Sequence, residues 1–578
     1  MGKKARLKAI RRASKENTPK ETNEERPALP VATSNSETSS TNVVYGSRWQ
    51  YIAVSLLVAI FFLLFKCFAA SPVSGDENIY FYVGRRVFEG LTPYREIFLA
   101  HPPGHLLIAA LFMASGIFTP FWFKLVSVLP ALITVLLVLW IMKRQGLKPL
   151  ILLITGLLLA LSHNFLSVAT HFTGANWSTL ALVAALACIV ANKKATAGIL
   201  LAFSGLISFH ILPAIMGLSV AYLLFYRRES LKTLIYAFVV TLLVHLACLI
   251  AFGDPYAEQV FGYHLSKTAM AKGGMSAITR FFHNEYHLAT FAFLSLLIYL
   301  KQLYGQIQTE GLKAKPNLLY TLVFAATFAQ IAGVFSVNRV FTYYLIPLAP
   351  LFVIASGLFF KTASQYLQTV KQSNEKLQSK TFKIMGVCLL ITICFISGEH
   401  LESEMGYYQR QYGEVSTYQW KDSACLPGFV NSSLKAILFN ETRRVGDLDC
   451  GLKRYFWHES VTENPQALLK FVMEYQNVEG TIFGDASTAP YFALMTGRKI
   501  TLEQADTNAQ LFKSGRIDMK KMLAKLNVDP PALLILNPKR GIASHPWFKN
   551  WVQNSYRMVH EVKTVKNKRL QLHLRRDL

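Results

Sequence analysis

The sequence predicts an all-α polytopic membrane domain, with about eleven transmembrane helices and the N-terminus inside, followed by a small extracytoplasmic α/β domain. Hydrophobic residues make up 52% of the 578 residues and charged residues only 16%, and the mean hydropathy is +0.30, a composition typical of membrane proteins. Apolar runs follow one another from residue 49 to residue 398, separated by short basic links. In residues 399–578 the pattern changes to short buried-strand and helix signals, which indicates a separate domain.

The first 48 residues form a basic tail that becomes rich in Ser, Thr and Pro, as in disordered segments. The apolar run that follows is too long and too far from the start for a cleaved signal peptide, so we expect a retained anchor and a cytoplasmic tail. The net charge of +26 gathers in this tail and in the short links, where the positive-inside rule places Lys and Arg. This distribution favours membrane lipids as partners and argues against nucleic acid.

The membrane domain, residues 49–398, divides into apolar spans when the basic links are taken as cytoplasmic. Loop 71–121 is then outside, although 105–118 is apolar enough to lie in or dip into the membrane. Making 105–118 a full span would put Lys143 and Arg144 outside, which we favour less. The predicted spans lie at about 50–70, 122–142, 149–168, a run ending at Lys193, 196–211, 212–226, 231–252, 286–301, 317–335, 341–360 and 383–398.

The C-terminal domain, residues 399–578, carries alternating strand and helix signals. TIFGDASTAPYFALMTGRKI predicts a strand, a turn at Gly484-Asp485 and a helix capped by Ser487 or Thr488. ALLILNP predicts a buried strand, WFKNWVQNSYRMVHEV a helix and KRLQLHLRR an alternating strand. With residue 398 outside the membrane in this topology, the domain is extracytoplasmic.

The cysteines indicate one candidate disulfide and no metal centre. Five of the seven lie in or beside apolar runs, where Cys acts as a small hydrophobe. Cys425 and Cys450 lie in the polar C-terminal part, and we expect them to pair in an oxidising compartment. No Cys/His spacing supports zinc. The sequence therefore supports no cofactor, and a divalent metal is left open without support.

The most informative stretch is residues 75–104, just beyond the first span. It opens with the acidic pair Asp76 and Glu77 and closes on His101-Pro102-Pro103. Asp76 precedes an amphipathic stretch that Gly90 and Pro93 end, so helix capping explains it. A general base that takes a proton from an acceptor hydroxyl explains it equally well. Both explanations stay open, because one residue can serve both.

Together with a later segment, these motifs carry a family resemblance. An Asp-Glu pair in the first outer loop, Tyr80-Phe81, Gly90 before the PYRE of residues 93–96, and HPP resemble the polyprenyl-phosphate-sugar-dependent membrane glycosyltransferases of the C superfold. These enzymes are related to protein O-mannosyltransferases and lipid A aminoarabinose transferases. RVFTYYLIPLAP at 339–350 adds to the resemblance, which covers roughly 49–360.

The resemblance implies that Asp76 is the catalytic acid/base, with Glu77 beside it. Its implied donor is a polyprenyl-phosphate sugar. One departure concerns the outer turn ATHFTGANW, where relatives often carry a second acidic residue. Here His171 and Asn176 occupy the turn, so neither a second carboxylate nor a metal site that it would complete is supported.

Basic residues in the outer loops are candidates for binding a phosphate, because positive-inside bias does not explain them there. Arg339, between two apolar helices, is the strongest candidate, followed by His264 and Lys267. Contact with anionic lipid headgroups is the alternative. The full set of candidate substrate-binding residues, basic and aromatic, is Arg85, Arg86, Tyr94, His101, His264, Lys267, Arg339, Tyr343 and Tyr344.

The sequence thus predicts an enzyme: a multi-pass glycosyltransferase of the plasma (inner) membrane. It would move a sugar from a polyprenyl-phosphate donor to a hydroxyl of a glycan, lipid or protein acceptor on the extracytoplasmic face, with inversion. A transporter or flippase of lipid-linked sugars is one alternative, although it should place ionisable residues at mid-membrane. A non-catalytic membrane scaffold with an extracytoplasmic domain is the other.

Overall fold

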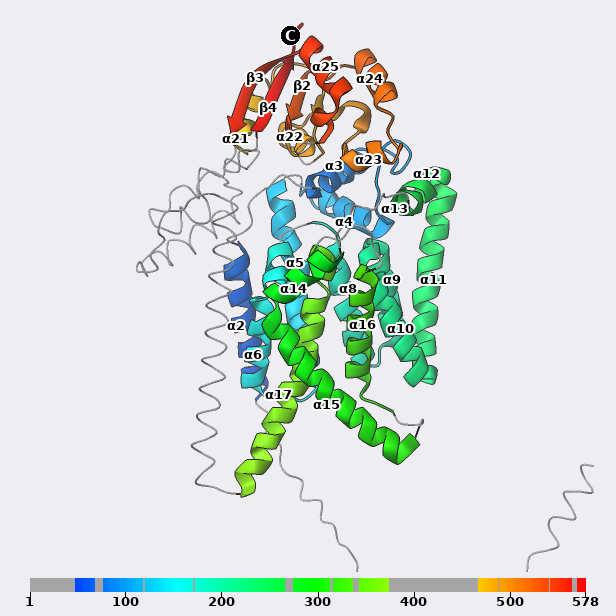
Figure 1. Ribbon diagram of the computed structural model, residues 1–578, viewed down its shortest axis with the longest axis vertical. Coiled ribbons are helices and arrows are strands. Elements are labelled where there is room, and N and C mark those ends of the chain that lie inside the picture. The colour runs from blue at the N-terminus through cyan, green and yellow to red at the C-terminus, as the bar shows by residue number, and fades with distance from the viewer. Residues whose placement is uncertain are drawn as a thin grey trace, which may run out of the picture. The chain divides into compact units, whose positions relative to one another are not determined.

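A helical part precedes a small α/β part in the computed structural model of the chain (Figure 1). The structure describes residues 47–67, 76–117, 120–169, 172–265, 274–311, 315–335, 342–373, 466–486, 488–539, 541–563 and 569–578. The predicted tail 1–48, apart from its last two residues, the predicted span 383–398 and the predicted pair Cys425 and Cys450 lie outside these ranges.

The helical part follows the order of the predicted apolar runs. Its helices are α2 (Arg48–Cys67), α3 (Glu77–Phe88), α4 (Pro103–Ala114), α5 (Pro120–Arg144), α6 (Pro149–Ala160), α7 (His163–Val168), α8 (Ala175–Val190), α9 (Lys194–Ile207), η1 (Phe209–Ile211), α10 (Leu212–Phe225), α11 (Arg227–Phe252), α12 (Asp254–Ala257), η2 (Glu258–Gly262), α13 (Tyr263–Leu265), α14 (Gly274–Asn284), α15 (Tyr286–Glu310), α16 (Leu318–Phe335), η4 (Thr342–Leu345) and α17 (Leu348–Ser373).

Five described helices are long and apolar enough to cross a membrane: Val126–Arg144, Arg227–Phe252, Tyr286–Glu310, Leu318–Phe335 and Tyr343–Tyr366. Each coincides with a predicted span. The other predicted spans within the described residues coincide with shorter apolar helices, among them α2, α6, α8, α9 and α10. Within the apolar run 105–118, residues up to Ala114 belong to α4, whose 12 residues reach about 18 Å, too short to cross a hydrocarbon core of about 30 Å.

The prediction of one helix over 149–168 is wrong, because the chain breaks into α6 and α7 at Leu161-Ser162. A buried carboxylate stabilises the break. Glu285 accepts hydrogen bonds from the Ser162 hydroxyl at 2.6 Å and from the backbone N–H of Asn164 at 2.8 Å. The Ser162 hydroxyl in turn caps α7 by accepting from the backbone N–H of Phe165. These polar partners lie far apart in the sequence, so local hydrophobicity does not reveal them.

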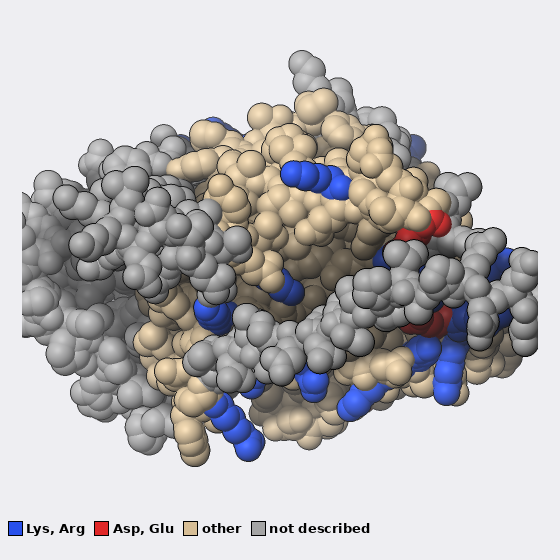
Figure 2. Space-filling model, turned by 90° about the horizontal axis from the view of Figure 1, so that it is seen from below, with Lys and Arg blue, Asp and Glu red and all other residues tan. Residues whose placement is uncertain are grey.

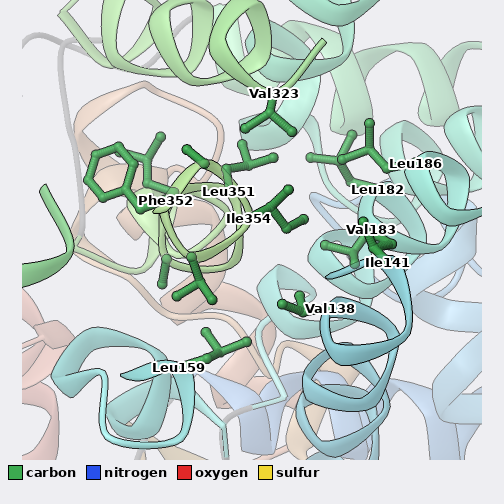
Figure 3. Packing of buried hydrophobic residues seen from close by; sticks show 14 of the residues in the cluster. Val138, Ile141, Leu159, Leu182, Val183, Leu186, Val323, Leu351, Phe352 and Ile354 are labelled. Atoms are coloured by element: carbon green, nitrogen blue, oxygen red, sulfur yellow. The ribbon is translucent and has the colours of Figure 1, made fainter. Parts of the chain in front are cut away.

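The main apolar core lies where α5, α6, α8, α16 and α17 meet. Figure 3 shows Ile354 of α17 between Val323 and the side chains of α5 and α8, including Val138 and Leu182. Residues 348–360 of α17 are almost entirely enclosed, whereas α11 buries little of its surface and exposes large apolar side chains such as Phe238 and Ile250. Such an apolar surface is suited to lipid contact.

The connections between helices fall into two sets. The links α5–α6, α8–α9 and α10–α11 are short and basic, and contain Lys143, Arg144, Lys193, Lys194, Arg227 and Arg228. Figure 2, seen from below, shows more Lys and Arg than Asp and Glu on that face. The alternate links, which follow α9, α11 and α16, hold the polar and aromatic residues that line the cavity described below.

The C-terminal part is built on a four-stranded sheet of order β1-β2-β4-β3. β1 pairs with β2 in parallel, and β4 pairs antiparallel with both β2 and β3. Its elements are α21 (Gln466–Glu474), β1 (Ile482–Gly484), α22 (Ala489–Thr496), η6 (Thr501–Glu503), α23 (Ala509–Lys513), α24 (Met519–Val528), β2 (Leu533–Leu536), η7 (Gly541–Ser544), α25 (Pro546–Ser555), β3 (Tyr556–Lys563) and β4 (Arg569–Arg575).

Most of the local predictions for this domain are confirmed. β1, β2 and β4 fall on the predicted strands, and α22 begins directly after Thr488. The helix predicted over 547–562 is wrong in its second half. It ends at Ser555, and Tyr556–Lys563 forms β3, because pairing with β4 along its length outweighs the helical pattern.

Candidate active site

The polar end of the helical part holds a cavity of about 680 Å³. Several segments far apart in the sequence line it: the start of α3, the loop before α4, η1, α13, the end of α16, η4 and part of the C-terminal domain. Of the residues proposed from sequence, the cavity brings together Asp76, His101, His264, Tyr343 and Tyr344.

α3 and α4 lie between the bundle and the sheet, and position the first of these residues (Figure 1). Two glycines let the helices approach closely. A Cβ at Gly84 of α3 would lie 2.7 Å from the Ala109 Cβ of α4, and a Cβ at Gly104 would lie 2.8 Å from the Leu206 carbonyl oxygen of α9. α3 is therefore packed tightly on α4, and α4 on α9.

Asp76 occupies the N-cap position of α3, as the capping interpretation predicts, but its side chain makes no capping hydrogen bond to the first turn. The side chain is exposed and lines the cavity instead. The capping interpretation therefore explains the position of Asp76 in the chain and not the direction of its carboxylate.

Glu77 has a different environment. It is buried at 2% exposure, and its Oε2 accepts a hydrogen bond of 3.3 Å from the backbone N–H of Phe172. Phe172 belongs to the link between α7 and α8, so Glu77 ties α3 to that link. It is not among the residues that line the cavity.

Tyr80 and His101 form a pair in the cavity wall. The Tyr80 hydroxyl and His101 Nε2 share a hydrogen bond of 2.7 Å. Burial raises the pKa of Tyr80 well above its usual value, and the nearby charges of Asp76 and Asp506 raise it further. Tyr80 therefore stays protonated, within the electrostatic reach of two carboxylates.

The loop that carries His101 is fixed from beneath. Tyr94, held at φ +64°, is buried and donates a hydrogen bond of 3.0 Å to the His101 carbonyl oxygen. His264 Nε2 donates to the Ala100 carbonyl oxygen at 2.7 Å, which fixes the proton on that nitrogen. Tyr94 thus supports the cavity wall without lining it, whereas His264 does both.

On another wall, Tyr344 stacks on His210 with ring centroids 5.3 Å apart and an interplanar angle of 6°. The buried Gln330 joins them by donating to the carbonyl oxygens of both residues. His210 is not among the candidate residues named from the sequence, so its place in the cavity wall was missed. Its spacing in an apolar run carries no signal of this role.

Two candidate phosphate ligands, Lys267 and Arg339, lie outside the described residues. Their neighbours in the sequence do line the cavity: Leu265 two residues before Lys267, and Tyr343 four residues after Arg339.

Arg85 and Arg86 are not among the residues that line the cavity, since their side chains contact Glu89 and the C-terminal domain. Arg86 pairs with Glu503 at 2.7 Å, and the Arg86 side chain is only 8% exposed. Burial lowers the pKa of Arg86, but hydrogen bonding and charge from Glu503 outweigh burial and raise it overall. Ten residues of helix separate Arg86 from Asp76, about 15 Å along the axis. This geometry favours a structural role for Arg86.

The C-terminal domain contributes three polar residues to the cavity that sequence reasoning missed: Asp506, Asn508 and Gln510. They lie in the segment QADTNAQ, which has no motif and is more than 400 residues from Asp76. Among the residues that the structure describes, no group of three or more His, Cys, Asp or Glu side chains could hold a metal ion.

Comparisons with known proteins place the fold. No family model and no curated protein matches the sequence. Two crystal structures of ArnT from Cupriavidus metallidurans are similar to it, one bound to undecaprenyl phosphate and one in the apo state. They align with TM-scores of 0.52 and 0.51 and identities of 11% and 12%, covering 90% of this chain and 97% of theirs. The chain therefore has the fold of ArnT, and the resemblance to the membrane glycosyltransferases of the C superfold is confirmed at the level of the fold.

Proposed function

We propose that this protein is a membrane glycosyltransferase that moves a sugar from a polyprenyl-phosphate donor to an acceptor hydroxyl, with Asp76 as the general base. One observation carries the proposal. In a fold similar to that of ArnT, whose structure contains undecaprenyl phosphate, the exposed carboxylate of Asp76 lines a cavity together with His101, His264, Tyr343 and Tyr344. A carboxylate and several imidazoles in one concave site are suited to proton transfer beside an anionic group.

The proposed reaction is a single displacement. Asp76 accepts the proton of the acceptor hydroxyl while that oxygen forms a bond to the anomeric carbon. The bond from this carbon to the phosphate oxygen breaks, and its electron pair leaves with the polyprenyl phosphate. Configuration at the anomeric carbon is inverted. No nucleotide takes part.

Charge on the departing phosphate needs hydrogen-bond donors. Arg339 is the proposed main donor and Lys267 the second, because a cavity-lining residue lies close to each in the sequence: Tyr343 four positions after Arg339 and Leu265 two positions before Lys267. His264 is fixed by its bond to Ala100, so its role is to hold the loop as well as to present a ring edge. Arg85 and Arg86 are left out of this set because they pair with Glu89 and Glu503.

The acceptor side follows from the helix links. The basic links lie at one end of the helices, and the cavity-lining links alternate with them. Because positive links stay in the cytoplasm, the cavity faces the extracytoplasmic side, together with the C-terminal domain. The acceptor, whether glycan, lipid or protein, reaches the cavity from that side of the plasma membrane.

The test is Asp76→Asn, with Asp529→Asn as the matched control. Asp529 is an exposed carboxylate of the C-terminal domain. Loss of a general base lowers turnover by about 10² to 10⁴-fold. Mass spectrometry of membrane lipids and surface glycans should therefore show a sugar transferred by the wild-type and Asp529→Asn proteins, and accumulated donor with Asp76→Asn. Unchanged transfer by a folded Asp76→Asn protein would remove Asp76 from the mechanism, and would favour a transporter or scaffold if no protein-dependent glycan appears.

A further inference from the structure

The C-terminal domain forms part of the cavity wall rather than only standing beside it. Asp506 is half-buried, Gln510 is 4% exposed, and both line the cavity with Asn508. The three residues lie within five positions of each other, Asp506 and Asn508 in the link between η6 and α23 and Gln510 in the first turn of α23. One short segment thus presents a carboxylate and two amide side chains to the same space as Asp76.

The segment is held on both sides by polar contacts with the helical part. Before it, Glu503 accepts a hydrogen bond of 2.8 Å from the Tyr82 hydroxyl and pairs with Arg86 at 2.7 Å. After it, Arg516 pairs with Glu258 at 3.2 Å. Between these two attachments in the sequence, Leu511 packs in an apolar cluster with Ala100 and Tyr263. The loop before α4, α13 and the C-terminal segment are therefore parts of one wall.

The backbone immediately before the segment, in η6, is under strain. Leu502 and Glu503 have φ of +60° and +50°, a conformation unfavourable for residues other than glycine. Hydrogen bonds compensate locally. Asp506 Oδ1 accepts from the backbone N–H of Asn508 at 2.9 Å, and the Thr507 hydroxyl donates to the Gly484 carbonyl oxygen at 2.8 Å. A strained conformation held from several directions is a common property of binding sites.

Charge indicates which part of a substrate meets this segment. Asp506 carries the same charge as a phosphate, so a polyprenyl phosphate placed against it would be repelled. A carboxylate and two amides match a ligand with several hydroxyl or amine donors. Tyr80, whose pKa is raised by burial and by the charges of both Asp76 and Asp506, lines the same cavity as the acid/base and the segment.

We infer that Asp506, with Asn508 and Gln510, binds the sugar ring of the donor and determines which sugar is transferred. The inference rests on the proposed function. In this arrangement the phosphate lies near His101, His264, Leu265 and Tyr343. The sugar faces the C-terminal domain. The second carboxylate of the site, absent from the outer turn ATHFTGANW, is then supplied from the far end of the chain.

The test compares two ligands on the full chain in nanodiscs: undecaprenyl phosphate alone, and the same lipid phosphate carrying a neutral hexose or an amino sugar. The preference for a sugar-bearing lipid over the bare lipid measures sugar recognition. Asp506→Asn keeps an oxygen that can accept from the backbone N–H of Asn508, so the turn is preserved. Asp529→Asn is the control.

We expect the wild-type and Asp529→Asn proteins to prefer at least one sugar-bearing lipid, and Asp506→Asn to lose about tenfold or more of that preference, the size of one charged hydrogen bond. Binding of the bare lipid should be unchanged or tighter in Asp506→Asn, because a like charge has been removed. A preference of equal size in Asp506→Asn, or no preference in the wild type despite binding of bare lipid, would overturn the inference alone. No binding of bare lipid by the wild type would instead overturn the proposed function, and the inference with it.

Discussion

Two faces of α3 contain similar residues and have different roles. On one face, Asp76 and Tyr80 line the cavity, and Tyr80 contacts His101. On the other, Tyr82 and Arg86 contact Glu503 of the C-terminal domain. Each face thus pairs a tyrosine with a charged residue. One helix thus contacts both the cavity and the C-terminal domain that completes it. The comparison also shows that residue type alone does not determine the role of a side chain.

The largest loss of stability should come from a substitution on the face of α3 that contacts the C-terminal domain. Arg86→Met leaves the carboxylate of Glu503 half-buried without its guanidinium partner, and breaking a buried pair in this way costs about 3–5 kcal/mol. Glu503→Gln should cost less, and the double variant should recover part of the loss. Thermal unfolding of the purified full chain measures all three.

A double-mutant cycle between positions 86 and 503 distinguishes a structural role of Arg86 from a substrate-binding role. Strong coupling between positions 86 and 503, with undecaprenyl phosphate affinity kept in the folded fraction, confirms a structural role. If Arg86→Met instead abolishes lipid binding without changing stability, the sequence-based assignment of Arg86 to the substrate is right. The two faces of α3 then do not have separate roles.

How far the sequence predicts this arrangement depends on the range of the interaction. Asp76 stands out because it begins a local motif just beyond an apolar span, and β2 stands out because LLIL is a short buried run. Arg86 has the same charge and the same local setting whether it binds phosphate or Glu503, so its role cannot be derived from the motif. The choice is made by the tertiary position of the C-terminal domain.

The same reasoning explains the other omissions. Asp506 enters the cavity only because two polar attachments, at Glu503 and Arg516, fix the C-terminal segment on the helical part. The break between α6 and α7 depends on Glu285, more than 100 residues later. Neither contact has a sequence period or motif, whereas the helices and strands follow from local periodicity.

Asp485 is a buried carboxylate that forms no ion pair with any residue the structure describes, in contrast to Glu503, which pairs with Arg86. Burial raises the pKa of Asp485 to about 7, and the backbone amides of Asn537 and Ile542 offset this only in part. Because the folded state then holds a proton that the unfolded state releases near pH 4, the free energy of unfolding falls as pH rises from about 4 to 7. The loss is on the order of 3 kcal/mol, to the accuracy of the pKa.

Asp485→Asn removes this ionisation and should flatten the dependence of the melting temperature on pH between 4 and 7. The measurement is thermal unfolding of the full chain across that range, with Asp529→Asn, at an exposed carboxylate, as the control. An equally steep dependence of the melting temperature on pH in Asp485→Asn would show that the ionisation of another group causes it.

Substitutions of Arg339 test whether this residue binds the donor phosphate. If its guanidinium forks onto the donor phosphate, Arg339→Lys loses the bidentate geometry, and affinity for undecaprenyl phosphate falls by about one to two orders of magnitude, equivalent to about 1.5–3 kcal/mol. If Arg339 only contacts lipid headgroups, lysine serves equally well and affinity stays the same. Unchanged affinity in both Arg339→Lys and Arg339→Ala would leave the phosphate to Lys267 and His264.

The smallest and most closely matched test uses the two tyrosines, two residues apart on α3. Tyr80→Phe removes the hydroxyl that contacts His101 at 2.7 Å, whereas Tyr82→Phe removes one that donates to Glu503 and accepts from the backbone N–H of Ile500 at 2.6 Å. Each loss is worth about 0.5–1.5 kcal/mol per hydrogen bond. We expect Tyr82→Phe to lower the melting temperature and leave the donor KM unchanged, and Tyr80→Phe to raise the donor KM with little change in melting temperature. Because both variants remove one oxygen from the same helix, a shared loss of packing cannot produce opposite signatures. If the two variants behave alike in both measurements, α3 is a single structural element and its two faces do not have separate roles.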